Sequence, residues 1–285
     1  SFGFFDCVDD AEVAKVLLDK AEAYGRAKQC ERIRGNMNLS ANQEMGVLVE
    51  GDQHAPFLAQ IYNPSHIAGL LEGAGYQAVH PMTSFVNREP AEWNADAFVA
   101  EKHKALRKDD SYLFRAFQRA RFDEEVESIR LVLNDAMASN YLFVPLTREE
   151  AQFQLGPLKL VMDTELVRIA EHEGEVVGVA MGVPNVNPLL RKMRSQLLPF
   201  GWWHFLRGRS KLREASIIII LVKTAYQSKG VIRLLTADLM QAAVERGYTA
   251  IGGTWIGDDN PRSRRSAEAI GMDPLHRVDM FEKTL

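Results

Sequence analysis

The sequence holds few of the residues that typify disulfide-stabilised, metal-binding or membrane-spanning proteins. It has only two cysteines, Cys7 and Cys30, and its seven histidines are not clustered, so we expect neither a disulfide framework nor a metal site. No run of about 18 apolar residues is present that would span a membrane as a helix. No secretory segment is recognisable, so we expect a cytoplasmic protein.

Charge of one sign is not in excess either. The 34 basic and 38 acidic side chains give a net charge of −4, which carries no global signal for nucleic-acid binding. The hydrophobic content of 46% and the charged content of 25% are average for a globular protein. The length of 285 residues predicts one large domain or two domains of ordinary size.

The most informative stretch is residues 215–247. Within it, Ile217–Val222 is an unbroken aliphatic run, which predicts a strand buried on both faces. From Val231 onward, apolar residues recur at helical spacing until Gly247 ends the helix. The loop Tyr226–Gly230 between them carries a cation, a hydroxyl group and a glycine. Free N–H groups and the positive end of the helix dipole bind anions at such a helix start, and a glycine there lets a phosphate approach the backbone.

This loop resembles the pyrophosphate-binding motif of the GNAT N-acetyltransferase superfamily, which is Gln/Arg-x-x-Gly-x-Gly/Ala between a central strand and a long helix. Here the motif is Gln227-Ser228-Lys229-Gly230-Val231-Ile232, so only the final small residue is replaced, by Ile232. A second family pattern follows, because Asn260 and Gly271 keep the expected spacing of eleven residues, with Met272 in the place of an aromatic residue. For the loop taken alone, an ordinary turn between a buried strand and a helix is the alternative.

The elements predicted for residues 111–285 follow the GNAT order, β-α-α-β-β-β-α-β-α-β. A strand at Tyr112–Phe117 precedes a helix at Phe122–Met137, and Thr147-Arg-Glu-Glu150 is a capping box for the next helix. A hairpin over Leu166–Val183 leads to the buried strand. The resemblance therefore implies an α+β (mixed α/β) GNAT acyl-CoA N-acyltransferase fold for this part of the chain.

The first 90 residues resemble the second half of the same fold and are interpreted as a partial first copy. Setting Leu17-Leu18 against Leu234-Leu235 places a predicted helix, Asp10–Lys28, on the long helix and a predicted strand, Phe2–Cys7, on the buried strand. This copy then begins at its central strand, without the front half. We expect a partial, degenerate copy at 1–90, a connecting helix at 91–110 and a complete GNAT-like domain at 111–285.

More closely, the chain resembles a group of bacterial tandem-GNAT proteins, to which the resemblance assigns no substrate. The segments that carry this likeness are Arg34-Gly35-Asn36-Met37-Asn38, Tyr62-Asn63-Pro64 and Leu198-Pro199-Phe200-Gly201-Trp202. In the first copy, Asp9 and Asp10 fall where the second copy has Tyr226 and Gln227, and their carboxylates repel a phosphate. We therefore expect coenzyme A to bind the second copy only. We also expect the two copies to form one unit, because a half-domain leaves strand edges exposed.

The GNAT resemblance implies that acetyl-CoA or another acyl-CoA lies in a cleft where two central strands separate. The thioester carbonyl would lie beside Leu221 and Val222, and Asn260 would contact the pantetheine arm while also being suited to cap a helix. The residues implied for the pyrophosphate are Gln227, Ser228, Lys229, Gly230 and Val231.

Acyl transfer to an amine requires one group to take a proton from the amine and another to give one to the leaving thiolate. The tyrosine that serves as the acid in many family members falls at Ala267, so the usual acid is absent. Asp258 and Asp259, at the mouth of the cleft, are candidate bases, although helix capping is the favoured role for them. Glu214 is a weaker candidate.

The expected function is that of an acyl-CoA-dependent N-acyltransferase acting on a small-molecule amine. The retained Gln227–Gly230 loop and Asn260 favour this enzyme. The alternative is a catalytically inactive GNAT-fold protein that binds a ligand or a partner, which is favoured by the missing tyrosine, Ile232 and the degenerate first copy. No nucleic-acid partner is expected, and an oligomer is left open.

The segment Leu189–Arg213 is an unusual insertion, because its aromatic residues cluster at Phe200–Phe205 and its cations lie on both flanks of that cluster. It could cover the acyl site as a lid, rest on an anionic membrane, or form an amphipathic arm packed on the first copy. We predict the lid, with Trp202 and Trp203 buried; membrane contact, which is not favoured, requires both to face solvent. The residues concerned are Arg191, Lys192, Arg194, Leu197, Leu198, Phe200, Trp202, Trp203, Phe205, Arg207, Arg209, Lys211 and Arg213.

Overall fold

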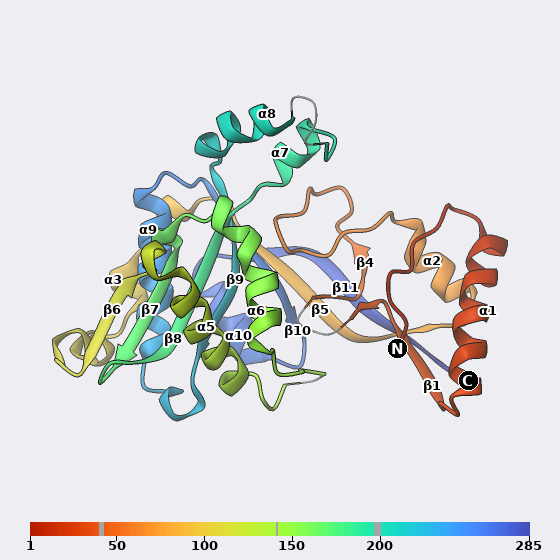
Figure 1. Ribbon diagram of the computed structural model, residues 1–285, viewed down its shortest axis with the longest axis horizontal. Helices are drawn as coiled ribbons and strands as arrows, with labels where there is room; N and C mark the ends of the chain where they lie inside the picture. Colours follow the sequence, from red (N-terminus) through yellow and green to blue (C-terminus); the bar gives the residue numbers. More distant parts are fainter. Residues whose placement is uncertain (40–42, 141, 197–200) are drawn as a thin grey trace.

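One mixed sheet of nine strands runs through the protein in the computed structural model, which describes residues 1–39, 43–140, 142–196 and 201–285 (Figure 1). The strand order is β1-β11-β5-β10-β9-β8-β7-β6, and β4 also pairs with β11. The strands are β1 Arg32–Gly35, β4 Val47–Glu50, β5 Gln77–Asn87, β6 Tyr112–Ala116, β7 Val167–His172, β8 Glu175–Pro184, β9 Glu214–Val222, β10 Ala250–Gly257 and β11 Asp273–Thr284. A separate small sheet pairs β2 Met37–Asn38 with β3 Glu44–Met45.

Helices cover both faces of the half of the sheet that ends at β6 (Figure 1). α9 (Val231–Glu245) packs on one face, and α5 (Phe122–Ala136) with α6 (Arg148–Leu155) on the other. The stripe predicted for α9 is its buried face, and Gly247 ends the helix with a φ of +77°. The predicted capping box of Thr147 and Glu150 is formed at the start of α6. The mixed α/β fold is thus confirmed.

The first 90 residues contribute strands to this same sheet. β5 lies between β10 and β11 and is antiparallel to both, so β10 and β11 are not neighbours although only α10 (Pro261–Glu268) separates them in sequence. β11 in turn lies between β5 and the strands β1 and β4. α1 (Ala11–Ala27) and α2 (His66–Gly73) pack beside this end of the sheet (Figure 1). The two parts of the chain therefore share one continuous sheet, as the exposed strand edges led us to expect.

The predicted strand Phe2–Cys7 is wrong. Phe2 does lie along β1, donating its N–H to the Arg34 carbonyl at 2.8 Å. Phe4, however, has a left-handed φ of +55°. The side-chain oxygens of Asn38 and Asn36 take the N–H groups of Phe4 and Phe5, at 2.6 and 3.2 Å. Hydrogen bonds to side-chain amides thus take the place of the backbone hydrogen bonds that a strand needs.

The predicted connecting helix is also not one helix. Its residues form separate turns, of which the α-helical ones are α3 (Ala95–Phe98) and α4 (Glu101–Lys104), with 3₁₀ turns on both sides. Asn94 starts the first of them by accepting the N–H groups of Asp96 and Ala97. Val99 and Ala100 then have extended backbone, which ends it. Residues 90–108 are called the connector below.

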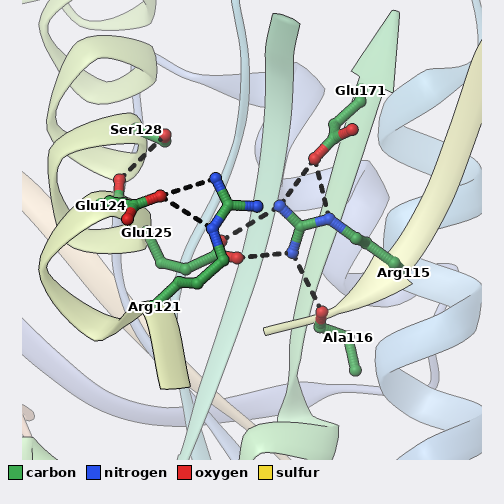
Figure 2. Close-up of polar contacts among 7 residues, drawn as sticks. All are labelled: Arg115, Ala116, Arg121, Glu124, Glu125, Ser128 and Glu171. Carbon is green, nitrogen blue, oxygen red and sulfur yellow. Dashed lines mark hydrogen bonds and ion pairs between the residues drawn. The ribbon is translucent and has the colours of Figure 1, made fainter. Parts of the chain in front are cut away.

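A buried ion network fixes the edge strand β6 to the rest of the sheet (Figure 2). Arg115 of β6 lies between Glu125 of α5 and Glu171 of β7, with shortest N–O distances of 2.7 and 2.6 Å. The side chains of Arg115 and Glu125 are only 14% and 2% exposed. Burial alone would lower the pKa of Arg115, but hydrogen bonds to both carboxylates raise it. The guanidinium therefore stays charged and compensates two acidic groups.

Replacing Arg115 by Met should lower the free energy of unfolding by about 3–5 kcal/mol, because Glu125 would stay buried without a counter-charge. The matched control is Arg121→Met, whose pair with Glu124 appears in Figure 2 and is 56% and 65% exposed. That change should cost at most about 1 kcal/mol. Urea unfolding of the two variants measures the difference, and equal losses would show that the Arg115 network does not hold β6.

Candidate functional site

The two central strands separate part-way along their length. β9 and β10 pair in parallel from Glu214 and Ala250 only as far as Ile217 and Gly253. At this point the register of β9 against β8 shifts, which leaves Ile218 as an extra residue. Thr254, the next residue of β10, donates its hydroxyl to the Ile218 carbonyl at 3.3 Å. Beyond it, β9 is no longer bonded to β10, so one edge of its backbone is available to a ligand.

Most of the residues expected to bind the cofactor lie on the separated part of β9 and at the start of α9. The separated parts of β9 and β10 are called the opening below. Leu221 and Val222 are on the separated part of β9, still paired with β8 on their other edge. Gly230 is the N-cap residue of α9, with a φ of +94°. Gln227, Ser228 and Lys229 are exposed just before it, and Val231 is the first helical residue. The separated part of β9 and the start of α9 therefore lie close together, and both belong to the stretch 215–247 that the sequence singled out.

The connector lies directly on this helix start. A Cβ on Gly230 would be only 2.4 Å from Cδ2 of His103, so the imidazole rests on the glycine. Nδ1 of His103 is buried and has no hydrogen-bond partner among the residues that the structure describes. Burial, with Lys102 and Arg233 adding to it, lowers the pKa of His103. A neutral imidazole thus covers the backbone that was expected to meet a phosphate, which no sequence pattern had indicated.

The acidic candidates at the mouth of the opening differ in what they contact. Asp258 pairs with Arg277 at 2.8 Å and with Arg264 at 3.4 Å. Asp259 follows it and is exposed. Asn260 caps α10, accepting the N–H of Ser263 at 3.1 Å, so the capping role weighed for it is confirmed. The favoured capping role is wrong for Asp258, whose carboxylate is held by arginines instead.

Two polar residues from the first part of the chain also reach the opening. Gln60 donates its side-chain N–H to the carbonyl of Gly253, the last paired residue of β10, at 2.8 Å. His80 of β5 places Cε1 3.8 Å from the position of a Cβ on Gly257, beside Asp259. Neither was predicted, because His80 arrives through the insertion of β5 between β10 and β11, and Gln60 comes from the distant segment between β4 and α2. Ala267, where the usual acid would stand, is buried in the core and carries no polar group.

The insertion does not cover the opening. Its helices α7 (Asn187–Lys192) and α8 (Gly201–Gly208) project from the rest of the molecule (Figure 1). Trp202 and Trp203 are 47% and 44% exposed, so the predicted burial of both in a lid is wrong. The residues Leu197, Leu198, Pro199 and Phe200, which were part of that prediction, lie outside the described residues. Glu214 is held by Asn185 at the base of the insertion, at 2.9 Å.

Two hollows in the surface, of about 860 and 410 Å³, lie elsewhere. The larger lies between the connector and the end of α10, and the smaller beside His276 and Arg277 of β11. None of the residues expected to bind the cofactor lines either of them. The candidate site is therefore marked by the separated strands and not by either of these two hollows.

Comparison with known proteins identifies the family. The Acetyltransferase (GNAT) family profile matches residues 130–272, and the chain belongs to this family. Its members are acyltransferases that generally use an acyl-CoA as co-substrate and act on amines. Within the described part of the chain, none of the helices has the length and apolar character needed to cross a membrane.

Two curated relatives match the whole chain. The chain is 30% identical over 290 residues to the bacterial ceramide synthase of Caulobacter vibrioides (strain NA1000 / CB15N), of which it covers 75%. It is 26% identical over 291 residues to protein YghO of Escherichia coli (strain K12), of which it covers 74%.

Solved structures support the fold. A glucosamine N-acetyltransferase region in a fungal multi-domain GH3 β-N-acetylglucosaminidase has a TM-score of 0.54 at 12% identity, covering 94% of this chain and 27% of that one. A tandem GNAT protein from the clavulanic acid biosynthesis pathway has a TM-score of 0.51 at 9% identity, covering 95% of this chain and 69% of that one. These likenesses show a shared fold over nearly the whole chain.

Gly230→Ala should destabilise the protein more than Gly247→Ala. Both glycines have a positive φ, which costs an alanine about 1–2 kcal/mol. At Gly247 nothing lies within 4 Å of the added methyl group, whereas at Gly230 it meets His103. We expect a further loss of about 1–3 kcal/mol at Gly230 from this overpacking.

Urea unfolding of both variants, and of Gly230→Ala in a His103→Ala background, separates two costs. One is the cost of the positive φ to an alanine, and the other is the cost of overpacking against His103. The extra loss at Gly230 should disappear once the imidazole is removed. Equal losses at the two glycines would mean that His103 does not rest on the helix start.

Proposed function

We propose that this protein is a cytoplasmic acyl-CoA-dependent N-acyltransferase whose acceptor is a long-chain amino alcohol of the sphingoid class. The observation that carries the proposal is the separation of β9 from β10 after Gly253, with the α9 start at the end of the separated strand. Membership of the GNAT family agrees with acyl transfer from coenzyme A. The acceptor is suggested by the relative named bacterial ceramide synthase, because a ceramide is an N-acylated sphingoid base.

The cofactor would be bound mainly by backbone groups. The free edge of β9 at Leu221 and Val222 would bond the pantetheine arm, and Asn260 would meet it from α10. The exposed loop Gln227–Lys229, with the N–H groups of Gly230 and Val231, would hold the pyrophosphate. Since His103 rests on Gly230, its side chain has to swing aside or share the site when a phosphate arrives.

Transfer begins with attack of the amine nitrogen on the thioester carbonyl, which forms the amide and expels the coenzyme A thiolate. The amine must be deprotonated and the thiolate protonated along the way. We propose Asp259 or the neighbouring His80 as the group that takes the amine proton, because Asp258 is held by two arginines. The proposed donor is not restricted to acetyl-CoA, and its acyl chain can be longer than two carbons.

We propose further that the chain is a tandem of a partial copy (1–90), a connecting segment (91–110) and a complete domain (111–285). The pairing supports this division, because β5 and β11, the last strands of the two parts, pair with each other. On its other edge β5 pairs with β10 of the second part, and β11 pairs with β4 of the first part. In the first copy, Asp10 caps α1 with its own carboxylate. That leaves its helix start unsuited to a phosphate.

The function is tested by incubating the full chain with acyl-CoAs of two to sixteen carbons and sphinganine, and detecting the amide by mass spectrometry. Separately, a bound acyl-CoA at about 100 times its Kd should stabilise the protein by about 2.7 kcal/mol in thermal unfolding. Amide formation is the expected result. Stabilisation without amide from any of a panel of long-chain and short amines would favour the inactive ligand-binding alternative.

Asp259→Asn or His80→Gln should lower kcat by about 10²–10⁴-fold if the residue takes the amine proton, with acyl-CoA affinity unchanged. Asp273→Asn, an exposed acidic residue at the start of β11, is the matched control and should leave kcat unaltered. A normal kcat in both the Asp259 and His80 variants would remove these residues from the mechanism without affecting the proposed reaction.

A further inference from the structure

The helices α7 and α8 with the following turn, residues 187–196 and 201–213, form a projecting arm that the proposed chemistry does not use (Figure 1). α8 packs on α7 through one face: a Cβ on Gly208 would lie 2.3 Å from Leu189, and Gly201 is buried. The opposite face of α8 carries Trp202, Trp203 and Leu206, which are 47%, 44% and 49% exposed. Two tryptophans and a leucine at helical spacing therefore face outward.

The arm is also the most positively charged part of the chain. Residues 187–213 contain seven Lys and Arg residues and no Asp or Glu. Since the whole chain carries −4, the remaining residues carry a net −11. None of the seven cations forms an ion pair with a carboxylate in the part of the chain that the structure describes. Arg207 instead lies over the ring of Trp203, with Cζ 4.3 Å from its centre.

We propose that this arm binds the surface of an anionic phospholipid bilayer. Trp202, Trp203 and Leu206 would enter the boundary between headgroups and acyl chains, where an amphipathic indole is most favourable. The cations on both sides would bind the lipid phosphates. The acidic remainder is repelled by the same surface, so the charge division also orients the molecule with the arm toward the lipid.

A bilayer fits these observations better than a second copy or a nucleic acid. Two copies of the arm would bring seven positive charges against seven, and three apolar side chains are too few to offset that repulsion. A nucleic acid would leave the outward Trp202–Leu206 face without an apolar partner. An exposed leucine, Leu160, extends the apolar surface at the base of the arm, where its carbonyl accepts from Arg209 at 3.2 Å.

Hydrogen bonds fix the start of the arm to the sheet. Asn185, buried at its base, donates its N–H to the Glu214 carbonyl at 2.8 Å and accepts the N–H of Leu58 at 3.1 Å. Docking would therefore place the bilayer near the end of β9 at which β9 and β10 are still paired. The proposal stands on the arm alone and does not require the acceptor proposed above.

The test is co-sedimentation of the full chain with vesicles of phosphatidylglycerol and phosphatidylcholine, compared with vesicles of phosphatidylcholine alone. We expect binding to the anionic vesicles at low salt, at least about tenfold weaker binding to the neutral ones, and loss at high salt. Trp202→Ala/Trp203→Ala should weaken binding at least about tenfold. Arg191→Ala/Lys192→Ala/Arg194→Ala should weaken it by about fivefold for each cation removed.

The matched control is Leu17→Ala/Tyr24→Ala, which removes two exposed apolar side chains, 45% and 69% exposed, from α1 beside β1. It should sediment like the unaltered chain, and all variants should keep its thermal midpoint. Wild-type protein that stays in the supernatant, or a control that loses as much binding as the arm variants, would overturn the proposal. So would arm-dependent self-association in light scattering, or arm-dependent binding to random-sequence DNA with equal affinity.

Discussion

The hydrogen bonding of β5 along both of its edges is the interaction on which the molecule depends. β5 is the only bridge in the described sheet between β10 and β11, and through β11 it carries β1 and β4. Without it, the last strand of the chain would have no partner on the side of the central strands. The same insertion brings His80 of β5 to the opening between β9 and β10. The insertion of β5 between β10 and β11 therefore shapes both the sheet and the candidate site.

The parts of the fold that sequence could predict are those with local causes. The apolar stripe of α9, the glycine that ends it and the capping box of α6 depend on residues a few positions apart, and all three are present. The strand predicted at Phe2–Cys7 failed because amides more than thirty positions away take its N–H groups. The prediction of one helix for the connector failed because Asn94 caps the start of α3 within it. That cap is local and could have been recognised in the sequence.

The candidate site divides in the same way. Its helix start, Gly230–Val231, and its strand, Leu221–Val222, belong to one continuous stretch, whose resemblance to the GNAT motif indicated them as a candidate site. The imidazole of His103 on Gly230 and the arginines on Asp258 come from distant segments, and nothing in the residues themselves indicates such pairings. The arm shows a third case: its residues were recognised as unusual, but composition alone did not decide whether two tryptophans point inward or outward.

The strand order also explains why a segment crosses the helix start at all. The chain leaves β5 at Asn87 and has to begin β6 at the far edge, five strand positions away, which is about 24 Å at 4.8 Å per step. α5 and α6 occupy one face of that path, so the chain passes over the face that holds α9. A chain with this strand order must therefore cross the face of the sheet that holds α9. The position of His103 over the start of α9 follows from this detour, so the strand order alone accounts for a side chain at that place.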